Sequence, residues 1–175
     1  MTHIDYTLYL VTDRSVMSAK SLEQAVEQAI QGGCTVVQLR EKYASSREFF
    51  ETAQRVKQIT DSYHIPLIIN DRTDICLAVN AAGIHIGQQD LPAKIVRSMV
   101  GPDKIIGVSA ATLSEAIQAE QDGADYLGVG AMFATSTKTN TRPVTIERLT
   151  QIKQAVQIPV VAIGGIQSSN VTTLT

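Results

Sequence analysis

Short apolar runs recur along this chain with helical segments between them, and this alternation limits its fold more than any other feature. Continuous apolar runs, as opposed to alternating ones, are typical of strands that are buried on both faces, as in a parallel sheet. The sequence therefore predicts seven parallel strands, at Leu8–Val11, Val36–Leu39, Leu67–Ile69, Ile84–Ile86, Ile105–Val108, Tyr126–Val129 and Val160–Ile163.

The segments between these runs carry helix signals. Leu22, Val26 and Ile30 repeat every four residues and share one face of a predicted helix. In a capping box, a hydroxyl at the helix start and a side chain three residues later bond to each other's backbone. That spacing occurs in Ser21 with Gln24, Ser45 with Glu48, and Thr112 with Glu115. Strand and helix in alternation predict right-handed βαβ units.

Two α/β architectures fit seven such strands: an open doubly wound sheet and a (β/α)8 TIM barrel. A barrel of this type has about 250 residues, and about 200 at the low end. The chain has 175 residues, of which 44% are hydrophobic, which is enough to bury a core and excludes a disordered protein. No linker divides it, so we expect one domain over residues 1–175.

Charge and cysteine content exclude several classes of protein. The formal net charge is −2, which argues against a general nucleic-acid binder, because phosphate binding depends on clustered positive charge. Cys34 and Cys76 form no disulfide framework or metal cluster and are expected to be packed thiols in a reducing compartment. No apolar run approaches the roughly 20 residues that span a bilayer. We therefore expect a cytoplasmic protein.

Polar side chains gather where each predicted strand ends. In parallel α/β proteins these ends meet on one face, which carries the active site. Gln38, Arg40 and Lys42 alternate at the end of the second strand and should point to one side. Two cations and an amide there form a candidate anion clamp, with an ordinary charged loop as the alternative.

Two carboxylates and one hydroxyl-rich loop extend this pattern. Asp71 and Asp90 follow neighbouring strands and are candidate Mg²⁺ ligands. The alternatives are a turn for one and a helix cap for the other, and Asp90, before Leu91-Pro92, suits the cap. The loop Ala134–Thr141 contains one lysine and, like Gly164-Gly165 after the seventh strand, is a candidate phosphate site or a simple polar connection. His85, between Ile84 and Ile86, is interpreted as a packed residue.

Taken together, these motifs resemble the thiamine-phosphate synthase family, in the family's order and at its spacing. The match rests on Tyr9–Arg14, Val37–Lys42, Ile69–Arg72, His85–Pro92, Gly107–Ser109, Asp125–Gly130, Thr135–Lys138 and Val161–Ile166. The resemblance implies a (β/α)8 barrel. It also implies a Mg²⁺-dependent transferase that joins a hydroxymethylpyrimidine diphosphate to a thiazole phosphate, releasing pyrophosphate and forming thiamine phosphate.

The resemblance also assigns roles to residues. Asp71 and Asp90 would bind Mg²⁺. The pyrimidine diphosphate would be held by Gln38, Leu39, Arg40, Glu41, Lys42 and Asn70. Ser109 and Lys138 would contact the pyrimidine substrate and its pyrophosphate, and the catalytic set would be Arg40, Lys42, Ser109 and Lys138. The thiazole phosphate would be bound by Thr135, Ser136, Thr137 and Gly165.

The chain departs from the family pattern in two places. Gly130–Ala134 stands where the family commonly has Gly-Pro-Ile-Phe-Pro, and the missing prolines predict a looser loop. Family members also continue through an eighth strand and helix, so the eighth βα unit is expected to be missing from these 175 residues. The alternatives are a thiazole tautomerase-like barrel and a truncated, non-catalytic binder of phosphate ligands. Association into a homo-oligomer is left open.

Overall fold

The computed structural model describes residues 4–135 and 142–174. The chain divides into two compact units, Met1–His85 with Ser98–Ile105 and Ile86–Arg97 with Ile106–Thr175. All seven predicted strands are present, two of them with the predicted bounds and five with one end shifted by one or two residues. Within the described residues, no helix is both long and apolar enough to cross a membrane.

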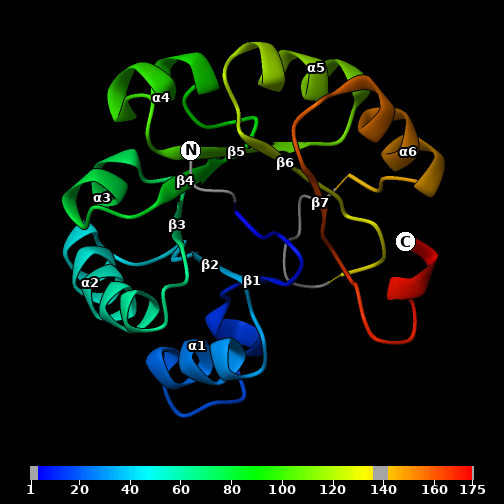
Figure 1. The fold of residues 1–175 in the computed structure, drawn as a ribbon. Coiled ribbons are helices and arrows are strands. Elements are labelled where there is room, and N and C mark those ends of the chain that lie inside the picture. The colour runs from blue at the N-terminus through cyan, green and yellow to red at the C-terminus, as the bar shows by residue number, and fades with distance from the viewer. Residues whose placement is uncertain (1–3, 136–141, 175) are drawn as a thin grey trace. The chain divides into compact units, whose positions relative to one another are not determined.

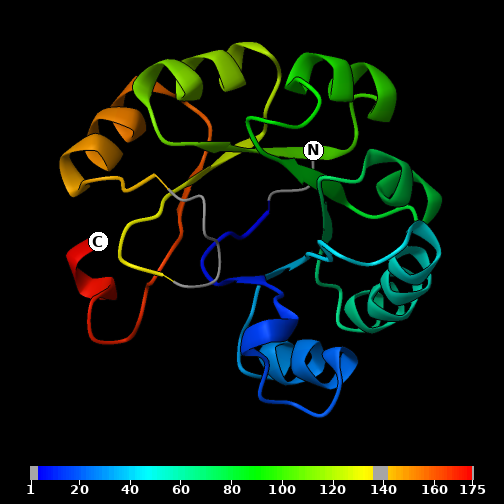
Figure 2. The same cartoon turned by 180° about the vertical axis from the view of Figure 1, so that it is seen from behind.

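The first unit contains parallel strands in the order in which they occur along the chain. Figure 1 shows its helices on one side of these strands, and Figure 2 shows the same arrangement from behind. The strands are β1 (Tyr9–Val11), β2 (Val36–Leu39), β3 (Leu67–Asn70) and β4 (Gly83–Ile86), and the helices are a short 3-10 turn η1 (Arg14–Val16), α1 (Leu22–Gln31), α2 (Ser46–Ser62) and α3 (Thr73–Ala78).

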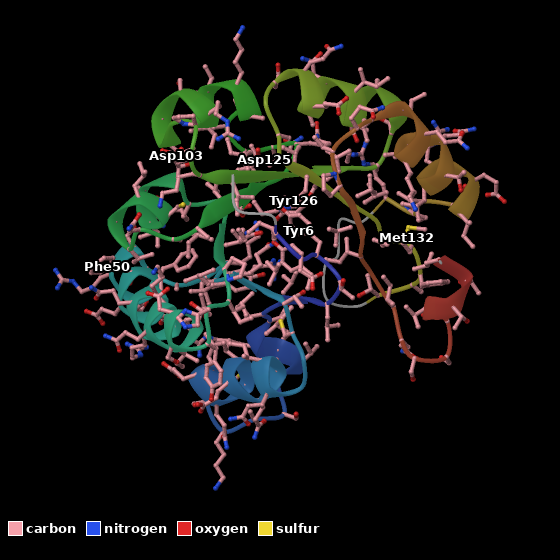
Figure 3. All side chains as sticks on the ribbon, in the orientation of Figure 1. Tyr6, Phe50, Asp103, Asp125, Tyr126 and Met132 are labelled. Carbon is pink, nitrogen blue, oxygen red and sulfur yellow. The ribbon has the colours of Figure 1, made fainter. Side chains whose placement is uncertain are left out.

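The second unit repeats the same βα organisation, again with parallel neighbours in chain order. It contains β5 (Ile105–Ala110), α5 (Leu113–Gln121), β6 (Tyr126–Val129), α6 (Ile146–Ala155), β7 (Val160–Ala162) and the 3-10 turn η2 (Val171–Leu174), while α4 (Ala93–Val100) crosses the boundary between the units. Asp125, labelled in Figure 3, accepts hydrogen bonds from Arg97 at 2.5 Å and from the N–H of Ile106 at 2.7 Å. These bonds tie the first part of α4 to β5 and β6.

Chain-order pairing distinguishes between the two architectures that the sequence left open. A doubly wound sheet reverses its strand order at a switch point, so that helices cover both faces. Among the strands of residues 4–135 and 142–174, neither unit contains such a reversal. The structure is therefore an α/β fold of parallel strands wound in one direction, which is the winding used by (β/α) barrels.

The predicted helix starts are confirmed, with one difference in detail. Ser45 with Glu48 and Thr112 with Glu115 form complete capping boxes at α2 and α5. Ser21 caps α1 by accepting the Gln24 N–H, but the Gln24 side chain accepts from the N–H of Lys20 instead of returning to Ser21. Each cap supplies an acceptor for backbone N–H groups that have no partner in the first turn.

Two glycines let neighbouring strands of this core approach closely. Gly83 lies just before the predicted strand Ile84–Ile86 but is the first residue of β4, where a Cβ would lie 2.2 Å from the carbonyl oxygen of Ile105. Gly107 in β5 faces Tyr126 of β6, which is fully buried (Figure 3). A Cβ on Gly107 would lie 2.1 Å from the ring carbon Cζ of Tyr126. The missing side chain at position 107 thus provides the volume that the tyrosine ring fills.

We expect Gly107→Ala to lower the free energy of unfolding by about 3 kcal/mol, because the new methyl group overlaps a buried ring that cannot move away. The matched control is Gly33→Ala, where φ is +100° but no atom lies within 4 Å of the added Cβ. That variant should lose about 1–2 kcal/mol from backbone strain alone. Urea denaturation measures both, and equal losses would show that packing at Gly107 is unimportant.

Candidate functional site

In the first unit, the predicted clamp residues lie at the carboxyl end of β2. Gln38 is buried within the strand, and its Nε2 donates to the Tyr9 hydroxyl at 2.9 Å. Asn70 ends β3, is also buried, and is in register with His85 of β4. Leu39 points into the core and is fully buried, so only its backbone is available to a ligand.

Arg40 is held through both its backbone and its side chain by the loop after β1. Its N–H donates to Oγ1 of Thr12 at 3.0 Å, and its Nη1 donates to Oδ2 of Asp13 at 3.1 Å. Thr12 is buried, and its own N–H donates to the carbonyl of Gln38 at 3.0 Å. The position of Arg40 at the strand end is therefore fixed from two directions.

The next two residues are also paired with carboxylate or guanidinium groups of the same unit. Glu41 accepts Nε of Arg14 on both carboxylate oxygens, at 2.8 and 3.1 Å. Lys42 forms an ion pair through its Nζ with Oδ2 of Asp71. Asp71 has a left-handed backbone, with φ of +63°, and its N–H donates to the carbonyl of His85 at 2.8 Å. Lys42, a cation of the predicted clamp, is thus paired with Asp71, a predicted metal ligand.

In the second unit, the turn that follows β4 is attached to the end of β5. Oδ2 of Asp90 accepts the N–H of Gly87 at 2.7 Å, a contact within the turn after β4, whereas the alternative role expected for Asp90 was a helix cap. Nε2 of Gln88 donates to the carbonyl of Ser109 at 2.8 Å. Asp90 and Ser109, two of the predicted site residues, therefore belong to one connected group at this strand end.

The ends of β6 and β7 meet through glycine. The N–H groups of Met132 and Phe133 donate to the carbonyls of Ile163 and Gly164, each at 3.0 Å. Gly165 has φ of +63°, and a Cβ there would lie 2.5 Å from the carbonyl oxygen of Ala134. Gly165 is thus brought beside the residues that lead into Thr135. Ser136, Thr137 and Lys138 lie outside the described residues.

The expected loosening of the segment before Thr135 is not what the structure shows at Ala131. Its N–H donates to the carbonyl of Arg142 at 3.1 Å, and its carbonyl accepts the N–H of Val144 at 2.9 Å. A proline at this position has no N–H and could not make the first bond. The alanine therefore adds a hydrogen bond that fastens this segment to the residues before α6.

The carboxylate at Asp13 has a shifted pKa with an identifiable origin. Hydrogen bonds from Ser15 lower the pKa of Asp13, and the Arg40 guanidinium adds to this effect, although burial opposes it.

Burial raises the pKa of the Cys76 thiol to about 11. Cys34 and Cys76 are both buried, as predicted for packed thiols. Among the described residues, no group of three or more His, Cys, Asp or Glu side chains is placed to hold a metal ion.

Sequence reasoning assigned no role to Thr12, Asp13 or Arg14, which contact the predicted clamp directly. The available signal was their position, since they follow the first strand as the clamp follows the second. Their partners are separated from them by 27 or 28 residues, so only the register of β1 with β2 shows the pairing.

The Asp13–Arg40 pair predicts a specific pH dependence. Because the pKa of Asp13 is lowered in the folded protein, its stabilisation is present above the ordinary pKa near 3.8 and is lost as the pH falls through the lowered value. We expect Asp13→Asn to cost about 1 kcal/mol between pH 5 and 7. Denaturation at several pH values should show this difference shrinking below pH 4, and a difference that stays constant down to pH 2 would contradict the assignment.

Comparison with known proteins gives a consistent result. A family model described as thiamine monophosphate synthase matches residues 8–175. A thiamine-phosphate synthase of Ruminiclostridium cellulolyticum is 63% identical over 98% of this chain and 81% of its own length. One of Clostridium tetani is 60% identical over 98% of this chain and 82% of its own length.

Solved structures agree with the sequence comparison. A thiamine phosphate pyrophosphorylase from Pyrococcus furiosus superposes with a TM-score of 0.87 and 40% identity, covering 95% of this chain and 79% of its own. A second such enzyme, from Bacteroides thetaiotaomicron, has a TM-score of 0.66 at 16% identity and supports the fold alone. With its polar strand ends, its chain-order parallel strands and these matches along nearly its whole length, the chain belongs to the thiamine monophosphate synthase family.

Proposed function

We propose that this protein is a thiamine-phosphate synthase, which joins the pyrimidine carbon of a hydroxymethylpyrimidine diphosphate to the nitrogen of a thiazole phosphate. The observation that carries the proposal is the placement of Arg40 and Lys42 at one strand end, each paired with a carboxylate of its own unit. The relatives that match nearly the whole chain are named as synthases, which favours this function over a tautomerase or a non-catalytic binder.

The proposed reaction breaks the bond between the pyrimidine methylene carbon and the diphosphate oxygen. The electron pair leaves with pyrophosphate, and the thiazole nitrogen then donates its own pair to the cationic carbon. Arg40, Lys42 and Lys138 neutralise the charge that grows on the departing group, while Gln38, Asn70 and Ser109 orient the pyrimidine substrate. Leu39 and Glu41 complete the substrate-binding segment. No protein nucleophile is required.

Mg²⁺ is the proposed cofactor, with Asp71 and Asp90 as its protein ligands. Carboxylate oxygens are the donors that this hard cation prefers, and one or two of them are sufficient when water and substrate phosphates fill the other positions. Asp71 fits this role because its carboxylate already binds a cation, the Lys42 ammonium. When bound, Mg²⁺ would neutralise charge on the diphosphate oxygens.

The thiazole phosphate is proposed to bind at Thr135, Ser136, Thr137 and Gly165. Support comes from the close approach of Gly165 to Ala134, which leaves no room for a side chain beside this loop. We further propose that both units form one (β/α)8-type barrel domain in a cytoplasmic enzyme that acts on small molecules and does not bind nucleic acid. A homo-oligomer stays a prediction.

The proposal is tested by incubating the protein with both substrates and Mg²⁺ and measuring thiamine phosphate and pyrophosphate. Arg40→Gln should lower kcat/KM for the diphosphate substrate by about 10- to 100-fold, because a hydrogen bond to a charged group is lost. Chelation of the metal should abolish the reaction.

Arg55→Gln is the matched control, since Arg55 pairs with Glu23 between α1 and α2 and is not one of the predicted site residues. It should keep the activity of the parent. Two outcomes would contradict the proposed role of the strand ends. One is an equal loss of activity in both variants, and the other is an Arg40→Gln variant that forms product as fast as the parent.

The Lys42–Asp71 pair predicts that Lys42 competes with the metal. Lys42→Met should bind Mn²⁺ alone about two- to fivefold more tightly than the parent, because a cation leaves the Asp71 carboxylate. In the presence of pyrophosphate the same variant should bind the metal less tightly than the parent, because the pyrophosphate that helps to hold the metal no longer has the Lys42 ammonium to bind it.

Electron paramagnetic resonance of free Mn²⁺ measures both affinities. Lys57→Met is the control, because Lys57 pairs with Asp61 on the surface of α2. If Lys42→Met bound Mn²⁺ alone more weakly than the parent, Lys42 would not compete with the metal for the Asp71 carboxylate.

A further inference from the structure

Asp13 makes two kinds of contact that together fix its carboxylate in space. Oδ1 accepts the N–H of Ser15 at 2.9 Å and its hydroxyl at 2.6 Å. These bonds place Asp13 at the N-cap of η1. They leave Oδ2 to accept Nη1 of Arg40. One oxygen is therefore anchored to its own loop while the other is directed at the arginine.

The Asp13–Arg40 pair is better shielded than the other arginine pairs of this unit. The exposed fractions of the two side chains are 19% for Arg40 and 13% for Asp13, against 52% and 30% for Arg55 and Glu23. Exposed ion pairs contribute little, because water and salt screen them and both side chains must be ordered. A shielded pair with one anchored partner restricts the orientation of the arginine more than an exposed pair does.

Within the described residues, Asp13 is the only side chain to which the Arg40 guanidinium is bonded. A guanidinium carries five N–H donors in a rigid fork, so one contact restricts its orientation and leaves donors for a bidentate bond to phosphate. Thr12 holds the backbone of the same residue. The loop after β1 thus orients Arg40, the residue that follows β2, without occupying its full donor capacity.

We propose that Asp13 is a positioning residue, which holds the Arg40 guanidinium in the direction of the diphosphate before the substrate arrives. This inference rests on the proposed function, in which Arg40 binds that group. Pre-orientation lowers the entropy that binding would otherwise cost. It also means that Asp13 acts only through Arg40 and does not itself touch the substrate.

A double-mutant cycle tests the inference, with inorganic pyrophosphate and Mg²⁺ as the probe and titration calorimetry as the measurement. Asp13→Asn keeps the size of the side chain and an acceptor for Ser15 but removes the charge that orients Arg40. It should raise the Kd of pyrophosphate about three- to tenfold in the parent and less than twofold in an Arg40→Gln background. Ser15→Ala, which removes the hydroxyl bond to Oδ1 and keeps the backbone N–H bond, should give a smaller loss in the same direction.

Glu23→Gln is the matched control, because it removes the charge of a carboxylate paired with an arginine in the same unit. Its Kd should equal that of the parent. Thermal melts should show that Asp13→Asn remains folded, and in the coupling assay it should raise the KM for the diphosphate and leave that for the thiazole phosphate unchanged.

Two results would overturn the inference: an equal loss from Asp13→Asn in both backgrounds, or no loss in the parent. Failure of the proposed function has a different signature. If the parent did not bind pyrophosphate, or Arg40→Gln bound it normally, the diphosphate site itself would be wrong, and the role of Asp13 would fall with it. If Arg40→Gln lost affinity and Asp13→Asn did not, only the positioning role would be excluded.

Discussion

Parallel strands that are buried on both faces leave little room for polar side chains except where each strand ends. Every residue of β2, β3 and β4 is buried. The polar members of these strands, such as Gln38 and Asn70, lie in or next to the last two positions. Charged groups are therefore concentrated in the loops that follow the strands, and the chemistry of the protein depends on how those loops are held.

Much of the fold was predictable because two-sided burial leaves a strong signal in sequence. All seven strands follow from continuous apolar runs, and the starts of α1, α2 and α5 follow from hydroxyl caps. The helices α3 and α4 were not singled out, since six and eight residues are too few for a clear period. The start of β4 was predicted one residue late. The contact that requires a glycine at Gly83 is with the carbonyl of Ile105, which lies in another part of the sequence.

The candidate site was predictable in its residue types and not in its pairings. The alternation of Gln38, Arg40 and Lys42 indicated an anion site, but which carboxylate each cation contacts depends on strand register and loop course. Lys42 meets Asp71 across 29 residues, a contact that no local pattern encodes. Ala131 illustrates the same limit, since replacing proline looks like a loss of rigidity until its hydrogen bond to Arg142 is seen.

The two ion pairs between the loops after β1 and β2 have opposite polarity. Asp13 is bound to Arg40, and the adjacent Arg14 is bound to Glu41. If β1 slipped by one residue against β2, acid would face acid or base would face base. Parallel strands with uniformly apolar faces are poorly protected against such slippage, because hydrophobic contacts do not distinguish one apolar neighbour from the next. The two ion pairs therefore fit the observed register of β1 with β2 and do not fit a register shifted by one residue.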